Sequence, residues 1–422
     1  MRTAKAVAAV FTAALALAGL SSTSYAFHSG GVAECGGCHS MHSPNPNGTY
    51  LLVGSDQSST CLSCHQNAND TGPSSYHVST VDTKLGPGQA PLQRNPGGDF
   101  GWLKKTFTYV LRGNTITEAG QTHGHNIIAA DYGYVVDPDN ATAPGGTFPS
   151  AQLSCVSCHD PHGQYRRLNN GTVSKVGGPI IASGSYDNSP TPAAGEAVGV
   201  YRLLAGAGYT VDGVTFNGVP SAVAPATYNR TEAVTQTRVA YGSVTASGHE
   251  SWGNWCGTCH PGMHSDGNYV HPIDENFGSS IKSVYDQYRG SGNMTGTTTD
   301  AYLSLVPFIE NSGQAYSALA AHAKNNNSQL GGPAVNDQVA CLSCHRAHAT
   351  GFVEGLRWNM EGELILVAGS WPGTDAAVVA AQDSKWSQGR TYAEMKAGYY
   401  DYPETKFATY QRVLCNKCHA KD

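Results

Sequence analysis

The feature that most constrains this chain is the pentapeptide Cys-x-x-Cys-His, which occurs six times and uses all twelve cysteines. On a helical turn, two thiols three residues apart face the same side and reach both vinyl groups of one porphyrin. The adjacent histidine then serves as the first axial ligand of the iron. This spacing is the attachment signature of c-type haem, so the sequence predicts six covalently bound haems. The six motifs are Cys35-Gly-Gly-Cys38-His39, Cys61-Leu-Ser-Cys64-His65, Cys155-Val-Ser-Cys158-His159, Cys256-Gly-Thr-Cys259-His260, Cys341-Leu-Ser-Cys344-His345 and Cys415-Asn-Lys-Cys418-His419.

Other uses of a Cys-x-x-Cys pair fit this sequence poorly. Zinc knuckles, thioredoxin-like redox pairs and disulfide frameworks all contain such pairs. None of them requires a histidine directly after the second cysteine, and none accounts for six copies with no cysteine left over. We therefore assign the twelve cysteines to haem thioethers and the six motif histidines to proximal iron ligands.

The first 26 residues have the pattern of an export signal. Arg2 and Lys5 precede an apolar run, Ala6–Leu20, that is too short to span a bilayer comfortably, and a small-x-small cleavage site ends at Ala26. We predict a signal peptide at 1–26 and a single hexahaem domain at 27–422. No later stretch approaches the roughly 18 apolar residues of a membrane span. The mature protein is expected to be soluble or peripheral and to lie outside the cell or on its outer surface, with the periplasm as the second possibility.

Composition limits the amount of regular structure. The chain has 50 Gly and 21 Pro, and its charged residues make up 13%, against about 25% in an average domain. Because Gly and Pro are the poorest helix formers, we predict mostly irregular loops with few short helices and minimal strand. These loops would wrap around a continuous chain of six haems that replaces much of a side-chain core. The net charge of −6 makes nucleic acid a poor partner.

Local patterns place the few regular elements that we expect. Segments Thr83–Gly101 and Gly177–Gly195 are dense in Gly, Pro, Asn and Ser, which predicts loops. Alternation in Lys104–Arg112 predicts a short strand. Short helices are predicted at Ile281–Tyr288, at Ala301–Ala323 with an interruption at Pro307, and at Phe407–His419.

Eleven histidines remain after the six proximal ligands, and five methionines remain after Met1. Because the methionines are fewer than the haems, bis-histidine ligation of every iron is favoured. Such ligation saturates the iron, keeps its potential below that of His/Met ligation and leaves no open site for a substrate. We rank last His123, which is two residues from His125, and His249, which lies in a Gly/Ser-rich segment. Six distal ligands are expected among His28, His42, His77, His125, His162, His264, His271, His322 and His348.

The spacing of some of these histidines restricts which haem they can serve. His42, His162 and His348 each follow a motif histidine by three residues, and His264 follows one by four. Three extended residues reach at most about 10–11 Å, which is too short to pass around a porphyrin to its other face. If these histidines are ligands, each must bind the iron of a haem other than the one attached to the neighbouring motif. Each motif that is followed by such a histidine would then bring two haems together.

The chain resembles the OmcS-like hexahaem c-type cytochromes that metal-reducing bacteria place on their outer surface. The resemblance implies loops around bis-histidine haems in alternating stacked and T-shaped contacts. It also implies polymerisation into filaments that carry electrons to iron oxides or partner cells, with other outer-membrane multihaem cytochromes as partners. His123 and His249 are not part of that family's pattern. The matching stretches are FHSGGVAEC (27–35), HQNANDTGPSSYH (65–77), APLQRNPGGDFGW (90–102), SCHDPHGQYRR (157–167), YNRTEAVTQTRVAYG (228–242), CLSCHRAHA (341–349) and YQRVLCNKCHAKD (410–422).

The resemblance further implies a homopolymer contact made by one residue. In such filaments His42 would ligate the fifth-motif haem of the neighbouring subunit, opposite His345. The spacing argument excludes only the haem beside His42; the choice of the neighbouring subunit comes from the resemblance alone.

Electron transfer is the function that these features favour. A multihaem nitrite- or sulfite-type oxidoreductase needs at least one iron with an open site, often with Lys in place of the motif histidine. All six motifs here end in His, and the spare histidines exceed demand. The main alternative is a monomeric electron shuttle or terminal metal reductase, which uses the same haems without the inter-subunit ligand.

Overall fold

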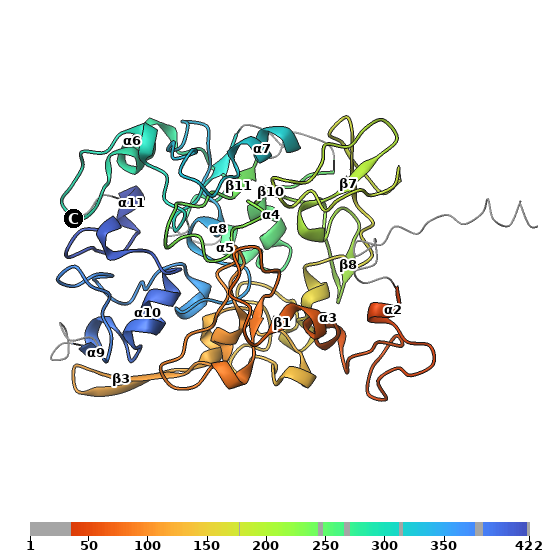
Figure 1. Ribbon diagram of the computed structural model, residues 1–422, viewed down its shortest axis with the longest axis horizontal. Helices are drawn as coiled ribbons and strands as arrows, with labels where there is room; N and C mark the ends of the chain where they lie inside the picture. Colours follow the sequence, from red (N-terminus) through yellow and green to blue (C-terminus); the bar gives the residue numbers. More distant parts are fainter. Residues whose placement is uncertain are drawn as a thin grey trace, which may run out of the picture.

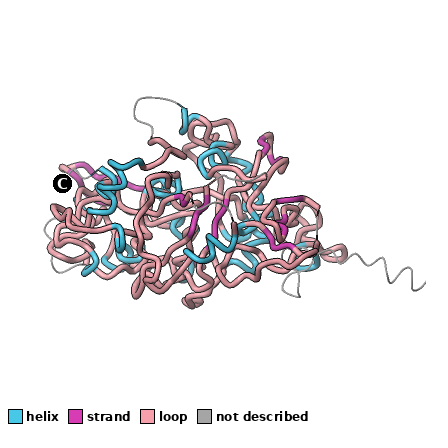
Figure 2. The backbone as a smooth tube through the Cα atoms, turned by 90° about the horizontal axis from the view of Figure 1, so that it is seen from above, coloured by secondary structure: helices cyan, strands magenta, loops and turns pink. Residues whose placement is uncertain are grey.

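The computed structural model describes residues 35–176, 178–243, 248–265, 271–311, 315–375 and 383–419. The predicted signal peptide and His28 lie outside the described residues, as does the side chain of His264. Loops dominate the described chain, and the helices and strands are short pieces between them (Figure 2). This confirms the predicted loop-rich fold with few short helices and little strand.

The α-helices of the described residues are short, and the longest of them has ten residues. None of the helices in the described ranges is long and apolar enough to cross a membrane. The helices are α2 (Cys35–Cys38), α3 (Gln57–His65), α4 (Trp252–Gly257), α5 (Gly262–Ser265), α6 (Gly278–Gln287), α7 (Tyr316–His322), α8 (Cys341–Cys344), α9 (Asp383–Trp386), α10 (Tyr392–Gly398) and α11 (Asn416–His419).

In the part of the chain that the structure describes, the strands form five small sheets. The longest pairing is the antiparallel hairpin β3–β4, and the orders β10-β11-β12 and β6-β5-β7 give the two three-stranded sheets; β1 pairs with β2, and β8 with β9. The strands are β1 (Gln66–Asn67), β2 (Ser79–Thr80), β3 (Phe107–Leu111), β4 (Asn114–Glu118), β5 (Arg166–Leu168), β6 (Val173–Ser174), β7 (Ala197–Gly199), β8 (Thr210–Val211), β9 (Val214–Thr215), β10 (Ser221–Val223), β11 (Ala240–Gly242) and β12 (Ile309–Glu310).

Two predicted helices are far shorter than expected, whereas α6 and β3 confirm their predictions. Only α7 forms within 301–323, because the segment after Pro307 extends as β12 and pairs with β11. Only α11 forms within 407–419, because Gln411 uses its backbone carbonyl to accept from the Ile365 amide at 2.7 Å. In both segments, hydrogen bonds to distant backbone replace the bonds of a helix.

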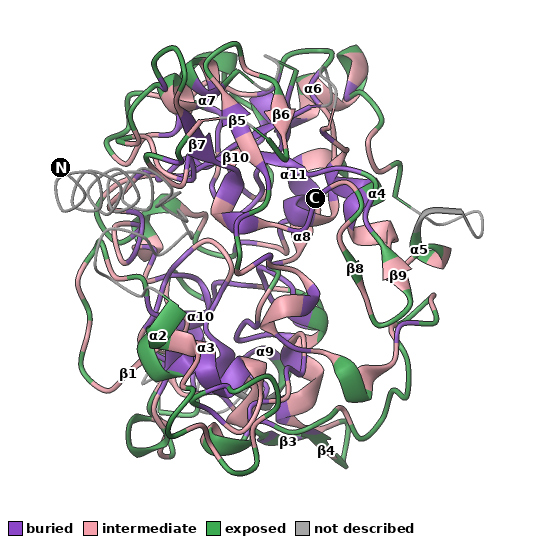
Figure 3. Cartoon of the chain, turned by 90° about the vertical axis from the view of Figure 1, so that its right-hand side faces the viewer, coloured by how far each residue is buried: buried purple, intermediate pink, exposed green. Residues whose placement is uncertain are grey.

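Aromatic side chains form half of the largest cluster of buried apolar residues, which lies in the C-terminal half of the chain. Trp371 and Tyr399 stack with ring centroids 4.4 Å apart. Motif cysteines Cys344, Cys415 and Cys418 pack against the edge of this cluster. Figure 3 shows buried segments inside the molecule around α3, α10 and α11, whereas α2 is exposed at the periphery. This core therefore supports the chain segments that carry the fifth and sixth haem motifs.

A buried charge network ties the β3–β4 hairpin to the C-terminal region. Glu118 forms an ion pair with Arg390, and its Oε1 lies 2.7 Å from Nε2 of His123. The side chains of all three residues are at most 4% exposed. Burial alone would raise the pKa of Glu118, but Arg390 and His123 hold that pKa below its ordinary value. The Glu118 carboxylate is therefore charged at neutral pH and accepts hydrogen bonds from the buried side chains of Arg390 and His123.

We expect Glu118→Gln to lower the free energy of unfolding of the haem-loaded protein by about 3–5 kcal/mol at pH 7, because it leaves Arg390 uncompensated. A depressed folded pKa contributes stability above the unfolded value of 4.5, and that stability is lost as the pH falls through the folded pKa. The difference between the two proteins should therefore shrink below about pH 4.5. Denaturant unfolding at several pH values measures it.

The matched control is Glu363→Gln, which removes an exposed carboxylate that contacts Arg412 and Lys385. Exposed ion pairs contribute about 1 kcal/mol or less, so this variant should unfold nearly like the parent. Equal losses in the two variants would contradict the role given to the buried network.

Candidate haem-binding site

Each Cys-x-x-Cys-His motif lies on a helical turn. The motifs lie on or at the end of α2, α3, α4, α8 and α11, and the third begins on the 3₁₀ turn Cys155–Ser157. Outside α3, the histidine amide donates to the carbonyl of the first motif cysteine at 2.8–3.1 Å, as in His39 to Cys35 and His419 to Cys415. This bond closes the turn and holds the two cysteines on one side. All twelve cysteines are described, and none is in a disulfide.

The motifs follow one another in space in the order of the sequence. The thiols of Cys61 and Cys155 interact electrostatically between the second and third motifs, and those of Cys256 and Cys341 do so between the fourth and fifth. The remaining junctions have electrostatically interacting thiols: Cys38 with Cys64, Cys158 with Cys259, and Cys344 with Cys418. Along the long axis of the molecule the order is α2, α3, α4, α8 and α11, so the first and sixth motifs lie toward opposite ends (Figure 1).

Backbone carbonyls orient the proximal imidazoles. Nδ1 of five motif histidines lies 2.8–3.0 Å from a carbonyl oxygen that a loop supplies. A carbonyl only accepts, so Nδ1 carries the proton and the unprotonated Nε2 faces away, as an iron ligand must. The pairs are His39 with Tyr50, His65 with Tyr76, His159 with Arg202, His260 with Pro144, and His345 with Glu354.

Within the described residues, four motif histidines face another histidine ring from a distant part of the chain. A metal–imidazole bond is about 2 Å long, so two imidazoles on opposite sides of one iron have ring centres about 6 Å apart. The observed centroid distances match this spacing. They are 6.4 Å for His39–His162, 6.4 Å for His159–His348, 6.0 Å for His260–His125 and 6.1 Å for His419–His271.

Burial keeps several of these imidazoles neutral. Burial lowers the pKa of His348 to about 3 and also lowers the pKa values of His125 and His159. Neutral imidazole is the form that ligates a metal. The chain therefore presents these ligands without first having to remove a proton at neutral pH.

The four ring pairs above do not include the second and fifth motifs. His65 donates from Nδ1 to Tyr76 in the same way as the other proximal histidines. Among the described residues, no histidine ring faces His345. His42 is exposed, next to Met41, whose side chain is 80% exposed. Within one chain, His42 and His345 are thus not brought together.

The remaining histidines have other surroundings. Nδ1 of His77 lies 2.7 Å from Asp70, and Nδ1 of His322 is hydrogen-bonded to Glu310; neither ring faces a motif histidine among the described contacts. His123 is fully buried with both ring nitrogens hydrogen-bonded. Burial lowers the pKa of His249 to about 4, and Nδ1 of this residue lies 3.1 Å from Ser221.

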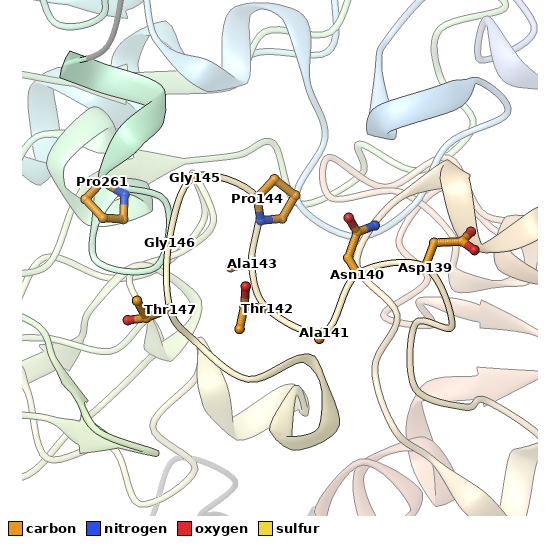
Figure 4. Close-up of a pocket in the computed structure, with 10 residues that line it drawn as sticks. All are labelled: Asp139, Asn140, Ala141, Thr142, Ala143, Pro144, Gly145, Gly146, Thr147 and Pro261. Carbon is orange, nitrogen blue, oxygen red and sulfur yellow. The ribbon is translucent and has the colours of Figure 1, made fainter.

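A cavity of about 560 Å³ lies beside the fourth motif, between loop 139–147 and Pro261 (Figure 4). This loop supplies the Pro144 carbonyl that orients His260. It approaches the motif so closely that a Cβ on Gly146 would lie 1.9 Å from the Cys259 carbonyl oxygen. Asp139 is the one charged residue among those that line the cavity, so the lining does not resemble a binding site for a polar ligand. We therefore assign the loop the role of positioning His260 through the Pro144 carbonyl.

Sequence reasoning overlooked one charged residue at the sixth motif. Lys417 lies between Cys415 and Cys418, and its side chain is buried. Burial lowers the pKa of Lys417 to about 8. The sequence indicates the importance of Lys417 through its position inside a haem motif, because any residue between two thioether cysteines lies close to the porphyrin.

No protein-family model matches the chain. The chain is 48% identical over 436 residues to the C-type cytochrome OmcS of Geobacter sulfurreducens, an alignment that covers 97% of this chain and 98% of the relative. This chain belongs to the OmcS family of c-type cytochromes. As a member of that family it binds haem c covalently, and the motif cysteines and the facing imidazoles described above fit that group.

Two solved structures of family members share the fold. The cryo-EM structure of OmcS nanowires from Geobacter sulfurreducens matches with a TM-score of 0.84 and 48% identity, and covers 94% of this chain and 100% of that chain. The structure of the Outer Membrane Cytochrome S filament from Geobacter sulfurreducens matches with a TM-score of 0.83 and 47% identity over the same shares. The loop-rich fold seen here is therefore the OmcS fold.

Proposed function

We propose that this protein carries electrons outside the cell through six bis-histidine haems and that it polymerises into conductive filaments. Haem iron supplies one-electron chemistry between its ferric and ferrous states. The chain supplies attachment, axial ligands and alignment. The signal peptide directs export, and electrons pass to iron oxides, to partner cells or to other outer-membrane multihaem cytochromes. We assign the protein to electron transfer and not to catalysis.

The ring pairs carry this proposal. Each of the four pairs joins one motif to a histidine at least 100 positions away, at the spacing of two ligands on one iron. We assign His162, His348, His125 and His271 as distal ligands of the first, third, fourth and sixth motifs. His28 is our assignment for the second motif and the neighbour's His42 for the fifth, which leaves His77, His264 and His322 outside the ligand set.

The order of the motifs supports transport from end to end. Cysteines of consecutive motifs interact electrostatically, and the first and sixth motifs lie toward opposite ends of the long axis (Figure 1). An electron that enters near one end can therefore pass through the haems in sequence order. A head-to-tail contact between copies extends such a path without closing it into a ring.

The exposed segment around the first motif suits such a contact. His42 lies in it with three large, exposed apolar side chains: Met41, Tyr50 and Leu51 are 80%, 76% and 50% exposed. Exposed apolar residues gathered in one segment are typical of an interaction surface. We assign this segment to the neighbouring subunit, where His42 would ligate the fifth-motif iron opposite His345. The relatives solved as filaments support the same assembly.

Cryo-electron microscopy of the purified, haem-loaded protein tests the proposal. We expect filaments with six haems per subunit, an unbroken haem path across the subunit contact and His42 at a neighbour's iron. Discrete monomers with six low-spin haems would overturn the filament and support a shuttle or terminal reductase. A haem with an open axial position and no sixth ligand would overturn the electron-only assignment.

A further inference from the structure

Lys417 is a buried cation inside the sixth haem motif. The residue is 4% exposed, and its side chain reaches from α11 to the end of α6. Nζ donates to the backbone carbonyl of Tyr288 at 3.0 Å and lies 4.4 Å from the ring centroid of Tyr285. Both partners are neutral, so they hold the ammonium in place through dipole and cation–π contacts without cancelling its charge.

The nearby carboxylates already have cations of their own. Asp286 pairs with Lys282, and Asp300 pairs with Arg289. No ion pair of Lys417 occurs among the residues that the structure describes. Among these five described side chains the three cations exceed the two carboxylates by one, so no described carboxylate is left to pair with Lys417. Lys105 shows the contrast, because this equally buried lysine has Glu394 at 2.7 Å.

We propose that Lys417 sets the reduction potential of the sixth-motif haem, raising it above the value that the ligands alone would give. Reduction adds one electron to the haem, and a cation held nearby in a poorly solvated region stabilises the added charge. Lys417 lies between the two thioether cysteines, and its charge interacts with the sulfur of Cys418, so it acts on this haem more than on the other five. Lys417 is thus a tuning residue and not a ligand. This inference rests on the proposed function, because it requires a bound haem at each motif.

The position of the sixth motif gives this effect a consequence for transport. The helix that carries this motif, α11, lies toward one end of the long axis of the molecule (Figure 1). A raised potential there lets electrons reside longer at that end of each subunit. Every copy in a head-to-tail filament then carries the same bias, next to the contact with the following copy.

Spectroelectrochemical titration of the haem-loaded Lys417→Met variant tests the inference. We expect one-sixth of the absorbance change to occur at a lower potential. The expected shift is about 59 mV, which corresponds to a tenfold change in the one-electron equilibrium constant for reduction of the sixth-motif haem. Lys417→Arg keeps the charge and should titrate like the parent. Lys385→Met removes a lysine whose side chain is 55% exposed and should also leave the curve unchanged. Lys417→Gln replaces the methionine variant if the latter does not accumulate.

The outcomes separate this inference from the proposed function. Haem content and the ferric spin state are measured first on the same samples. Six low-spin haems with an unchanged titration in Lys417→Met would overturn the tuning role and leave the proposed function intact. An equal shift in Lys417→Arg would overturn it as well, because a packing defect would then explain the change. Fewer than six haems in the parent protein would overturn the proposed function itself.

Discussion

Replacing His42 with alanine is expected to abolish long filaments while each chain keeps six covalently attached haems. His42 is exposed and three residues from the first motif histidine, so it is free to reach a neighbour and too close to serve its own haem. If it ligates the neighbour's fifth-motif iron, its loss removes a metal–ligand bond from every subunit contact. Negative-stain microscopy should show monomers and short oligomers. One haem in six should also become high-spin in the ferric protein, because His345 would be the only axial ligand left there.

Asn47→Ala is the matched control for this experiment. Asn47 lies in the same exposed segment, and the substitution also shortens a polar side chain to alanine. This variant should form filaments of normal length with six low-spin haems. Normal filaments in His42→Ala would refute the inter-subunit ligand. Loss of filaments in both variants would show that the contact depends on the segment's surface and not on ligation.

The second large effect is expected for His162→Ala. The His162 ring lies 6.4 Å from that of His39 and nearly parallel to it, at 9°. Removing this ring should leave one of the six irons with a single axial ligand within its own subunit. Electron paramagnetic resonance should then show a high-spin ferric signal from one haem per chain, and the ferrous protein should bind one carbon monoxide. Filaments should persist, because His42 is intact.

His77→Ala distinguishes a ligand from a histidine that is merely buried. His77 is 6% exposed, and its Nδ1 is bonded to Asp70, but its ring faces no motif histidine among the described contacts. This variant should remain fully low-spin. A high-spin haem in His77→Ala would make His77 a distal ligand after all, and an all-low-spin spectrum for His162→Ala would remove His162 from the ligand set.

Local spacing explains which features of the fold were predictable. The strand at Lys104–Arg112 and the helix at Ile281–Tyr288 depend on short-range alternation and helical periodicity, and both formed as β3 and α6. The helices predicted at 301–323 and 407–419 were wrong over most of their length. There, backbone groups bond to β11 and to Ile365, contacts from remote residues that no local pattern indicates.

The haem-binding site likewise has features that the local sequence predicts and features that depend on tertiary contacts. Taken alone, the sequence determined how many haems the chain can attach and which histidine follows each pair of cysteines, because thioether attachment needs only residues within one helical turn. Only the tertiary structure decided which distant imidazole faces each motif, as His125 faces His260 at 6.0 Å. It also decided the order of the motifs along the molecule and the burial of Lys417. These features depend on how loops from separate parts of the chain pack together, and residue spacing carries no record of that packing.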